Sequence, residues 1–223
     1  MGRGDAGAAP AGDLAAPLAL EAVWPRASVV IGNPPFLGKS NQSKEQKSDL
    51  ESVTRGLHGA GDLDFVCGWY VLAAKYLGLN HQAHAAFVST NSITQGEQVA
   101  VLWGEMHRLG MHIHFAHRTF QWSNEASGKA AVHCVIVGFG PNDQADKTIY
   151  EYEDIKGLPH AVPAKRINAY LVDAPDVLLN KRRMPICQVT EMTNGSKPTD
   201  GGNLLLEDAE KERLLMVEPQ AKK

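Results

Sequence analysis

The residues best suited to chemistry form the tetrapeptide Asn33-Pro34-Pro35-Phe36, which follows the apolar run SVVIG. Each proline lacks a backbone N–H and fixes its own φ, so an apolar strand that ends here stops in a stiff turn. An amide oxygen and a neighbouring backbone carbonyl can together accept both hydrogens of an exocyclic amino group, and Phe36 offers a ring on which a planar heterocycle can stack. These residue types favour presentation of the amino group of an extruded base to an electrophile, without a metal. The alternative interpretation is a plain loop entry, because Asn-Pro-Pro also occurs by chance.

The elements expected to position this turn alternate between strands and helices. Buried strands are expected in SVVIG, AHAAFVSTNS, MHIHFAH and AAVHCVIVGFG, and a further strand in KTIYEYEDIKG. Helices are expected from an Asp62 cap through LDFVCGWYVLAAKYLGL, over residues 98–109 and over residues 207–217. The polar, Gly-rich stretch between Gly38 and Asp62 is expected to form a long mobile loop.

Alternating strands and helices imply parallel pairing through crossover helices, so the predicted fold class is an α/β, Rossmann-like three-layer sandwich. The strands over His112–Ala116 and Ala130–Phe139 are joined without an obvious helix, which predicts an antiparallel hairpin at the edge of the sheet. Ligands of open α/β sheets bind at the carboxyl ends of strands, where Asn33 lies.

Composition and cysteine usage indicate the class of protein. A hydrophobic content of 43% and a charged content of 21% are typical of a globular protein. The net charge of -3 gives no sign of a nucleic-acid partner, which would have to meet a local basic patch. Cys67, Cys134 and Cys187 are far apart and indicate reduced thiols, and no apolar run is long enough for a bilayer, so a cytoplasmic location is expected.

The turn and four longer blocks resemble a known family. NPPF at a strand end resembles the amino-methyltransferases that use S-adenosylmethionine, especially the adenine-N6 DNA methyltransferases. The methyltransferase region of MmeI-like (type IIL) restriction–modification proteins resembles the blocks DLDFVCGWYVLAAKYL, AAFVSTNSITQGEQVAVLW, IHFAHRTFQWSNEASGKAAVHCVIVGF and RINAYLVDAPDVLLNKRRMPI. The resemblance covers residues 29–185 and implies a site-specific DNA methyltransferase that methylates N6 of an extruded adenine.

The resemblance also implies roles for individual residues. Asn33 and the Pro34 carbonyl are expected to accept hydrogen bonds from N6 of the adenine, with Phe36 completing the catalytic turn. Phe120 and Trp122 are both candidates for the ring that stacks on the base. The alternative for either ring is a rim aromatic that packs on the edge strand.

Other candidate residues have weaker signals. Asn91 and Ser92 are expected to line the same cleft, and a helix N-cap or turn role is the alternative. Basic side chains expected to contact the DNA backbone, or alternatively to lie in solvated polar loops, are Lys39, Lys44, Lys181, Arg182 and Arg183. The alternating His112 and His114 have no partner at ligand spacing, so we expect core or cleft histidines and no metal site.

The family's cofactor pocket is built mainly by elements that precede the NPPF turn, including a Gly-rich strand-to-helix turn. The residues before Asn33 contain no such turn. We therefore expect that the S-adenosylmethionine pocket is largely missing from this chain. Either a separate chain supplies the cofactor-binding half, or the chain is an inactive, poorly stable remnant of an interrupted gene. Double-stranded DNA is the expected partner, and the isolated chain is expected to self-associate through an exposed edge or to unfold with only partial cooperativity.

The expected organisation has three parts: a disordered lead-in over residues 1–17, the methyltransferase catalytic half over residues 18–160, and the start of a truncated target-recognition or linker region over residues 161–223. Two other functions stay open. A non-catalytic DNA-binding or assembly subunit would bind duplex without an effect of S-adenosylmethionine, and an NPPF-type protein glutamine methyltransferase would prefer a Gln-containing peptide to DNA.

Overall fold

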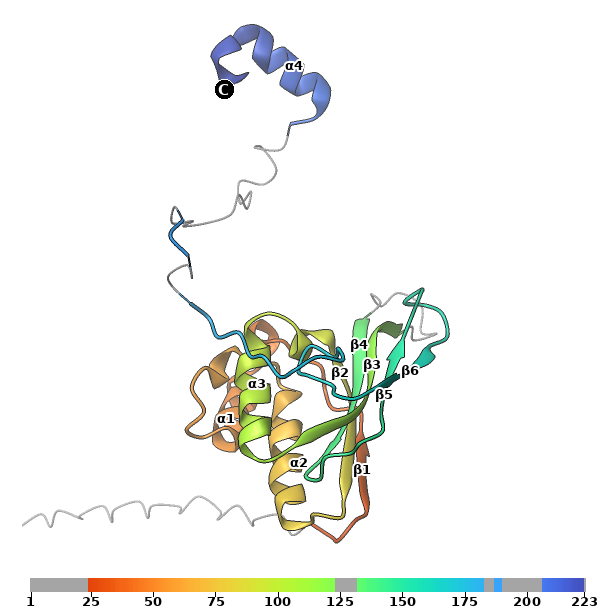
Figure 1. The fold of residues 1–223 in the computed structure, drawn as a ribbon. Helices are drawn as coiled ribbons and strands as arrows, with labels where there is room; N and C mark the ends of the chain where they lie inside the picture. Colours follow the sequence, from red (N-terminus) through yellow and green to blue (C-terminus); the bar gives the residue numbers. More distant parts are fainter. Residues whose placement is uncertain (1–23, 123–131, 183–186, 190–205, 223) are drawn as a thin grey trace, which may run out of the picture. The chain divides into compact units, whose positions relative to one another are not determined.

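A six-stranded mixed sheet with the strand order β1-β2-β4-β3-β5-β6 is the central element of the fold (Figure 1). The computed structural model describes residues 24–122, 132–182, 187–189 and 206–222. Two neighbouring pairs, β1 with β2 and β3 with β5, are parallel, and the other neighbours are antiparallel. The strands are β1 (Val29–Gly32), β2 (His84–Thr90), β3 (His112–Trp122), β4 (Val132–Gly140), β5 (Lys147–Glu151) and β6 (His160–Ala164).

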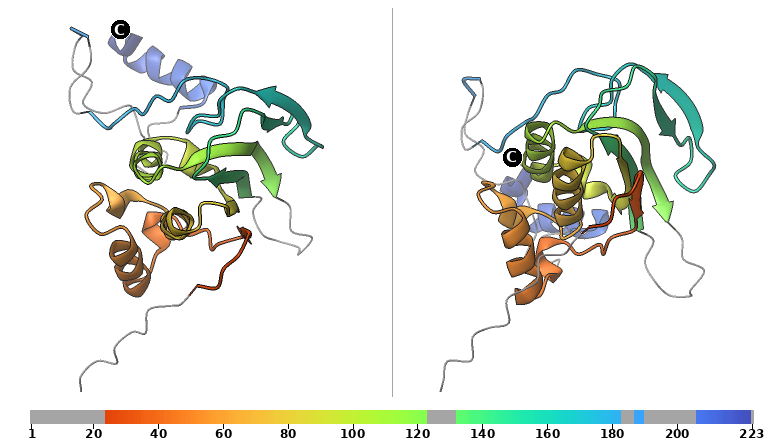
Figure 2. Two further views of the ribbon diagram at one scale, coloured as in Figure 1. Left: turned by 60° about the horizontal axis from the view of Figure 1, so that its bottom comes forward. Right: turned by 90° about the horizontal axis from the view of Figure 1, so that it is seen from below.

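Three helices lie on one face of this sheet, with α2 and α3 side by side (Figure 2). The described residues therefore supply two of the three layers expected for the α/β sandwich. No helix in the described ranges is long and apolar enough to cross a membrane. The helices are α1 (Lys44–Val53), α2 (Cys67–Leu79), α3 (Glu97–Arg108) and α4 (Asp208–Val217), with short 3-10 helices η1 (Lys39–Asn41), η2 (Ala60–Asp62), η3 (Asn91–Thr94) and η4 (Pro219–Lys222).

The chain divides into two compact units, residues 1–180 and residues 181–223. The first unit continues past residue 160, where we expected a boundary, because β6 pairs with β5 along the whole of its length. Beyond β6, Ile167, Ala169 and Leu171 are buried in the same hydrophobic core. The expected lead-in over residues 1–17 lies outside the described residues.

The antiparallel pairing of β3 with β4 was predicted, but the prediction that this hairpin forms an edge was wrong. β2 pairs with the far side of β4, and β5 pairs with the far side of β3, so both strands lie inside the sheet. The sequence analysis missed β6, whose residues HAVPA include a proline and a histidine and show no apolar alternation.

Two other local predictions were wrong. The stretch after Gly38 is not one long loop, because Ser43 and Gln46 form a capping box that starts α1. Asp62 does not cap the next helix, since it ends η2 and forms an ion pair with Lys39, and α2 begins only at Cys67.

An aromatic cluster fills the core between the sheet and the helices. Tyr70 of α2 stacks on Phe139 of β4 at 5.3 Å and meets Phe87 of β2 edge-to-face at 5.3 Å. Its buried hydroxyl shares a 2.8 Å hydrogen bond with Ser89, so the polar group is satisfied. Burial raises the pKa of Tyr70, which keeps the phenol neutral in this core.

Side chains of β3 pack directly against the backbone of β4, which explains the two glycines in its segment VIVGFG. The ring of Phe115 lies directly over Gly138, where an added Cβ would come within 2.1 Å of the ring. At Gly140, an added Cβ would lie 2.7 Å from the His114 ring. The first contact leaves no room for any larger side chain at position 138.

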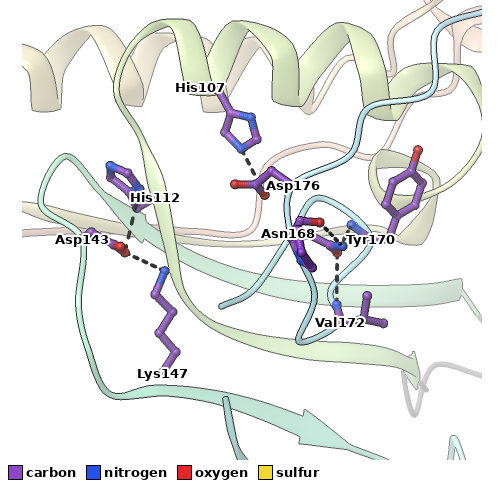
Figure 3. Close-up of polar contacts among 9 residues, drawn as sticks. His107, His112, Asp143, Lys147, Asn168, Tyr170, Val172 and Asp176 are labelled. Atoms are coloured by element: carbon purple, nitrogen blue, oxygen red, sulfur yellow. Dashed lines mark hydrogen bonds and ion pairs between the residues drawn. The ribbon is translucent and has the colours of Figure 1, made fainter. Parts of the chain in front are cut away.

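The segment after β6 is folded by its own side chains, as Figure 3 shows. Asn168 is buried, and its Oδ1 accepts hydrogen bonds from the backbone N–H groups of Tyr170, at 3.0 Å, and Val172, at 3.4 Å. Asp176 lies 3.9 Å from His107 of α3, which brings the segment next to the last turn of that helix. The residues after β6 thus form an ordered part of the first unit.

Candidate functional site

The NPPF turn lies at the carboxyl end of β1, as the sequence predicts. β1 is parallel to β2, and its last residue, Gly32, is paired with Phe87. In the turn, Pro34 is buried, Asn33 and Pro35 are exposed, and Phe36 is half-buried. Among the described residues, no group hydrogen-bonds the Asn33 side chain, so its amide is available to a ligand.

The turn forms one wall of a small cavity of about 270 Å³. The opposite wall comes from Trp122 at the end of β3 and Val132 at the start of β4. Ligand pockets are typically ~300–1,000 Å³, so this cavity is of the size that suits a small planar group. It combines an amide, the carbonyl-bearing backbone of the turn and aromatic rings. Among the described residues, its lining is Asn33, Pro34, Pro35, Phe36, Trp122 and Val132.

The two candidate stacking rings have different surroundings. Trp122 lines the cavity beside the turn and is 41% exposed. Phe120 is stacked on Tyr152 at 5.4 Å and does not line that cavity. Tyr152 in turn shares a 2.8 Å hydrogen bond with Nδ1 of His117, so Phe120 belongs to an aromatic cluster between β3 and the residues after β5.

Burial affects the titratable groups of that cluster. It lowers the pKa of His117 and raises the pKa of Tyr152, so both groups are held in their neutral forms near neutral pH. His117 also stacks on Tyr150 of β5 at a centroid distance of 4.2 Å. These contacts give the cluster a structural role beside the cavity.

Asn91 and Ser92 follow β2 directly and begin η3. Neither lines the cavity at the turn. The backbone carbonyl of Asn91 accepts from Thr94 Oγ1 at 2.8 Å, and Ser92 Oγ donates to the carboxylate of Asp64. Both contacts fit the turn role that we kept as the alternative, although Thr90 and not Asn91 is the cap of η3.

The sequence analysis missed the residues that hold the chain just after the turn. The carbonyl of Leu37 accepts hydrogen bonds from the Phe65 backbone N–H, at 2.9 Å, and from Gln42 Nε2, at 3.1 Å. Gln42 is buried and also donates to the Leu63 carbonyl at 3.0 Å. The sequence carried no signal for this role, because Gln42 stands in a polar stretch and its burial is visible only in the structure.

The basic residues expected to contact DNA are dispersed. Lys39 pairs with Asp62, and Lys44 is exposed in the first turn of α1. Lys181 and Arg182 are exposed and belong to the second unit. Arg183 lies outside the described residues.

A second, larger cavity of about 620 Å³ meets the turn from the other side. It runs between β1 and α2, and its walls are mostly apolar. Tyr76 closes one end, where its hydroxyl donates to the Pro25 carbonyl and accepts from the Ala27 N–H, each at 2.8 Å. We call this cavity the β1–α2 groove. It is lined by Trp24, Pro25, Ala27, Val29, Val30, Ile31, Gly32, Asn33, Pro34, Pro35, Trp69, Leu72, Ala73, Tyr76 and Phe87.

The β1–α2 groove does not provide a complete site for S-adenosylmethionine. In the part of the chain that the structure describes, its lining contains no carboxylate for the ribose hydroxyls and no Gly-rich turn between a strand and a helix. Among the described residues, no group of three His, Cys, Asp or Glu side chains could hold a metal ion. The chemistry that the described residues can supply is therefore that of the small cavity: acceptance of amino hydrogens and stacking.

Comparisons with known proteins agree with the resemblance. The family model of the MmeI DNA-methyltransferase domain matches residues 14–151, and that of the MmeI target recognition domain matches residues 173–223. The chain is 42% identical over 176 residues to DNA methyltransferase A of Bacillus subtilis (strain 168), covering 79% of this chain and 19% of that protein.

The solved structure of the type IIL restriction–modification enzyme MmeI in complex with DNA is also similar. It shares 55% sequence identity with this chain at a TM-score of 0.75, and the match covers 87% of this chain. The chain spans only 26% of that structure and 19% of the curated relative. The open mixed sheet described above is therefore a methyltransferase-type arrangement.

Proposed function

The chain belongs to the MmeI DNA-methyltransferase family, and from this membership we propose that it presents adenine in a site-specific, S-adenosylmethionine-dependent DNA methyltransferase of a restriction–modification system. The reaction proposed is methyl transfer to N6 of an adenine extruded from double-stranded DNA. The observation that carries the proposal is the small cavity, in which the NPPF turn faces Trp122.

The turn provides the acceptors that an amino group needs. The Asn33 carboxamide is exposed and without a partner among the described residues. The Pro34 carbonyl next to it belongs to a buried residue in a turn that two prolines stiffen. Hydrogen bonds from N6 to these two oxygens hold the amino group in place and leave the nitrogen lone pair available for attack. S-adenosylmethionine, when bound, supplies an electrophilic methyl group. Positioning and preorganised acceptors are the contributions of this chain.

Stacking supports the same assignment. Trp122 and Phe36 both line the cavity, so an inserted base has two aromatic rings within its walls. Stacking on one aromatic ring contributes ~1–3 kcal/mol per base. We assign Trp122 as the stacking ring because it lines the cavity, whereas Phe120 does not and is stacked on Tyr152.

The donor half of the site belongs, in this proposal, to further elements that pack next to the β1–α2 groove. Exposed Val29 and Ile31 on β1, together with the apolar lining of the groove, offer a surface for a further strand and helix. DNA contacts are proposed for Lys44, and for Lys181 and Arg182. The last two lie within the region that matches a target recognition domain.

The test measures transfer of labelled methyl groups from S-adenosylmethionine to unmethylated double-stranded DNA by this chain in complex with the donor half, followed by nucleoside analysis. Asn33→Ala is expected to lower the rate of N6-methyladenine formation by at least ~100-fold, because the side-chain acceptor for the amino group is lost. The matched control is Asn41→Ala, an exposed asparagine in η1, which should retain full activity. Full activity of Asn33→Ala, or methylation of a Gln-containing peptide in preference to DNA, would contradict the proposal.

A second pair of variants tests the stacking assignment. Trp122→Ala is expected to lower kcat/KM by ~5- to 150-fold, the equivalent of one lost base stack. Phe120→Ala, which removes a ring outside the cavity lining, should have the smaller effect. A larger loss in Phe120→Ala than in Trp122→Ala would reverse the assignment.

A further inference from the structure

We propose that Asp64 is a positioning residue for the NPPF turn, acting through the chain that follows it. This proposal rests on the proposed function. Asp64 is only 6% exposed, and it lies between η2 and α2 without being part of either. It touches none of the groups assigned to the target base, so its role is to hold other residues in place.

The contacts of Asp64 tie it to the end of β2. Its Oδ2 accepts hydrogen bonds from Thr90 Oγ1, at 2.9 Å, and from Ser92 Oγ. Its backbone N–H donates to Gln98 Oε1 of α3 at 2.9 Å. A buried carboxylate with such partners forms charge-assisted bonds, which are about twice as strong as neutral ones. Asp64 is thereby fixed to the strand and the helix behind the turn.

The residues on either side of Asp64 hold the chain after the turn. Phe65 donates its backbone N–H to the Leu37 carbonyl, and Gln42 bridges that carbonyl to the Leu63 carbonyl. The chain also passes close to the carboxylate, since a Cβ added to Gly38 would lie 3.5 Å from Asp64 Oδ1. A displacement of residues 63–65 must therefore move residues 37 and 38.

The turn needs this second anchor because the first is short. β1 has four residues, and among the described strands it pairs only with β2. Two prolines stiffen the turn but contribute no N–H to a hydrogen bond. Without the Asp64 contacts, the segment that carries Phe36 and the Pro34 carbonyl would be anchored at one end instead of two. The rate of a reaction is sensitive to shifts of about 1 Å in the groups that position the substrate.

Hydrogen exchange of the full chain tests the mechanical part of the proposal. In Asp64→Ala, the amides of Phe65 and Asn41, which bond to the Leu37 and Gly38 carbonyls, are expected to exchange at least ~tenfold faster. Exchange in the β3–β4 hairpin should stay unchanged. Asp64→Asn keeps two hydrogen-bonding atoms and should restore most of the protection. Asp49→Ala, at an exposed position of α1, is the matched control and should change neither region.

Kinetics test the functional part. Asp64→Ala is expected to lower kcat for methyl transfer by ~10- to 100-fold while KM for DNA changes less than about threefold, because the base still binds but is badly placed. Asp64→Asn should recover most of kcat. Unchanged exchange at Phe65 and Asn41 in Asp64→Ala overturns the positioning role, and so does an unchanged kcat.

The two proposals fail in different ways. If Asn33→Ala retains full activity in the complex with the donor half, or that complex with the wild-type chain transfers no methyl group, the proposed function fails, whereas faster exchange in Asp64→Ala still supports the anchor. If Asn33→Ala is inactive and Asp64→Ala behaves like Asp49→Ala, the function stands and the positioning role is wrong.

Discussion

The two edges of the sheet differ in how they would receive a further strand. On β1, Val29 is 58% and Ile31 is 77% exposed, and the strand contains neither a proline nor a charge. On β6, the exposed residues include Pro163, which has no N–H to offer a neighbour. Proline in an edge strand is a common protection against unwanted pairing. One edge is therefore protected, and the other is suited to pairing.

The helix beside β1 supports the same distinction. α2 is apolar almost all the way round, and its Trp69, Leu72 and Tyr76 line the β1–α2 groove. A helix of this kind is normally covered on all sides. The comparison shows that the NPPF turn follows the edge strand that is open to further pairing, whereas the opposite edge is protected. The proposal of a donor half that packs next to β1 requires such an open edge.

The largest effect on the free energy of unfolding is expected in the central strands of the sheet, where side chains are tightly packed. Gly138→Ala places a Cβ within 2.1 Å of the Phe115 ring, so it should lower the free energy of unfolding by about 3 kcal/mol. The matched change next to the open edge is Gly32→Ala, whose Cβ would lie an ordinary 3.4 Å from Phe87. It should cost less than about 1 kcal/mol. Urea unfolding measures both, and equal losses would contradict the contrast.

The open edge itself is tested by its effect on self-association. Ile31→Lys places a charge at the most exposed apolar position of β1. Burial of an isoleucine contributes ~1.5–3 kcal/mol, so dimer dissociation constants should rise by ~10- to 100-fold. Ala161→Lys, at an exposed site of β6, is the control and should change nothing. Sedimentation of the full chain measures both, and a wild-type chain that stays monomeric over the whole concentration range would remove the basis of the prediction.

The smallest effect is a pH dependence of stability that arises in the sheet interior. Burial lowers the pKa of His114 and of His117, both in β3, and nearby His84 and Lys147 lower that of His114 further. Because their pKa values in the folded state lie below the usual value of about 6.5, the unfolded chain binds more protons just below that pH. Stability should therefore be complete above pH ~6.5 and fall as the pH decreases through the folded-state pKa values. Urea unfolding at several pH values measures this slope. His114→Asn should flatten it, and an unchanged slope would contradict the assignment.

Much of the fold could be predicted from the sequence because its signals are local. The apolar runs around Val30, Phe87 and Val137 identify the central strands, and the prolines mark the end of β1. Two errors came from signals with more than one meaning. A polar stretch with a serine and a glutamine three residues apart was taken for a loop, although it begins a helix, and Asp62 was taken for a cap, although it pairs with Lys39.

The site was predictable only in part, for a physical reason. The NPPF residues are adjacent in sequence, so their common role is visible. The contacts of Asp64 with Thr90 and Ser92 join residues 26 and 28 positions apart, and no periodicity or motif announces them. Likewise, the choice between Phe120 and Trp122 depends on Tyr152, which only the pairing of β3 with β5 brings near.

The contacts within the segment after β6 bear on how the sequence beyond it could be exchanged between related genes. Asn168 satisfies the N–H groups of Tyr170 and Val172, and Asp173 accepts from the N–H groups of Lys165 and Arg166. Because these polar groups find their partners within residues 165–173, that part of the segment holds its fold through its own contacts. The match to a target recognition domain begins at residue 173, so a change of sequence beyond it would alter the matching region and leave the NPPF turn unchanged.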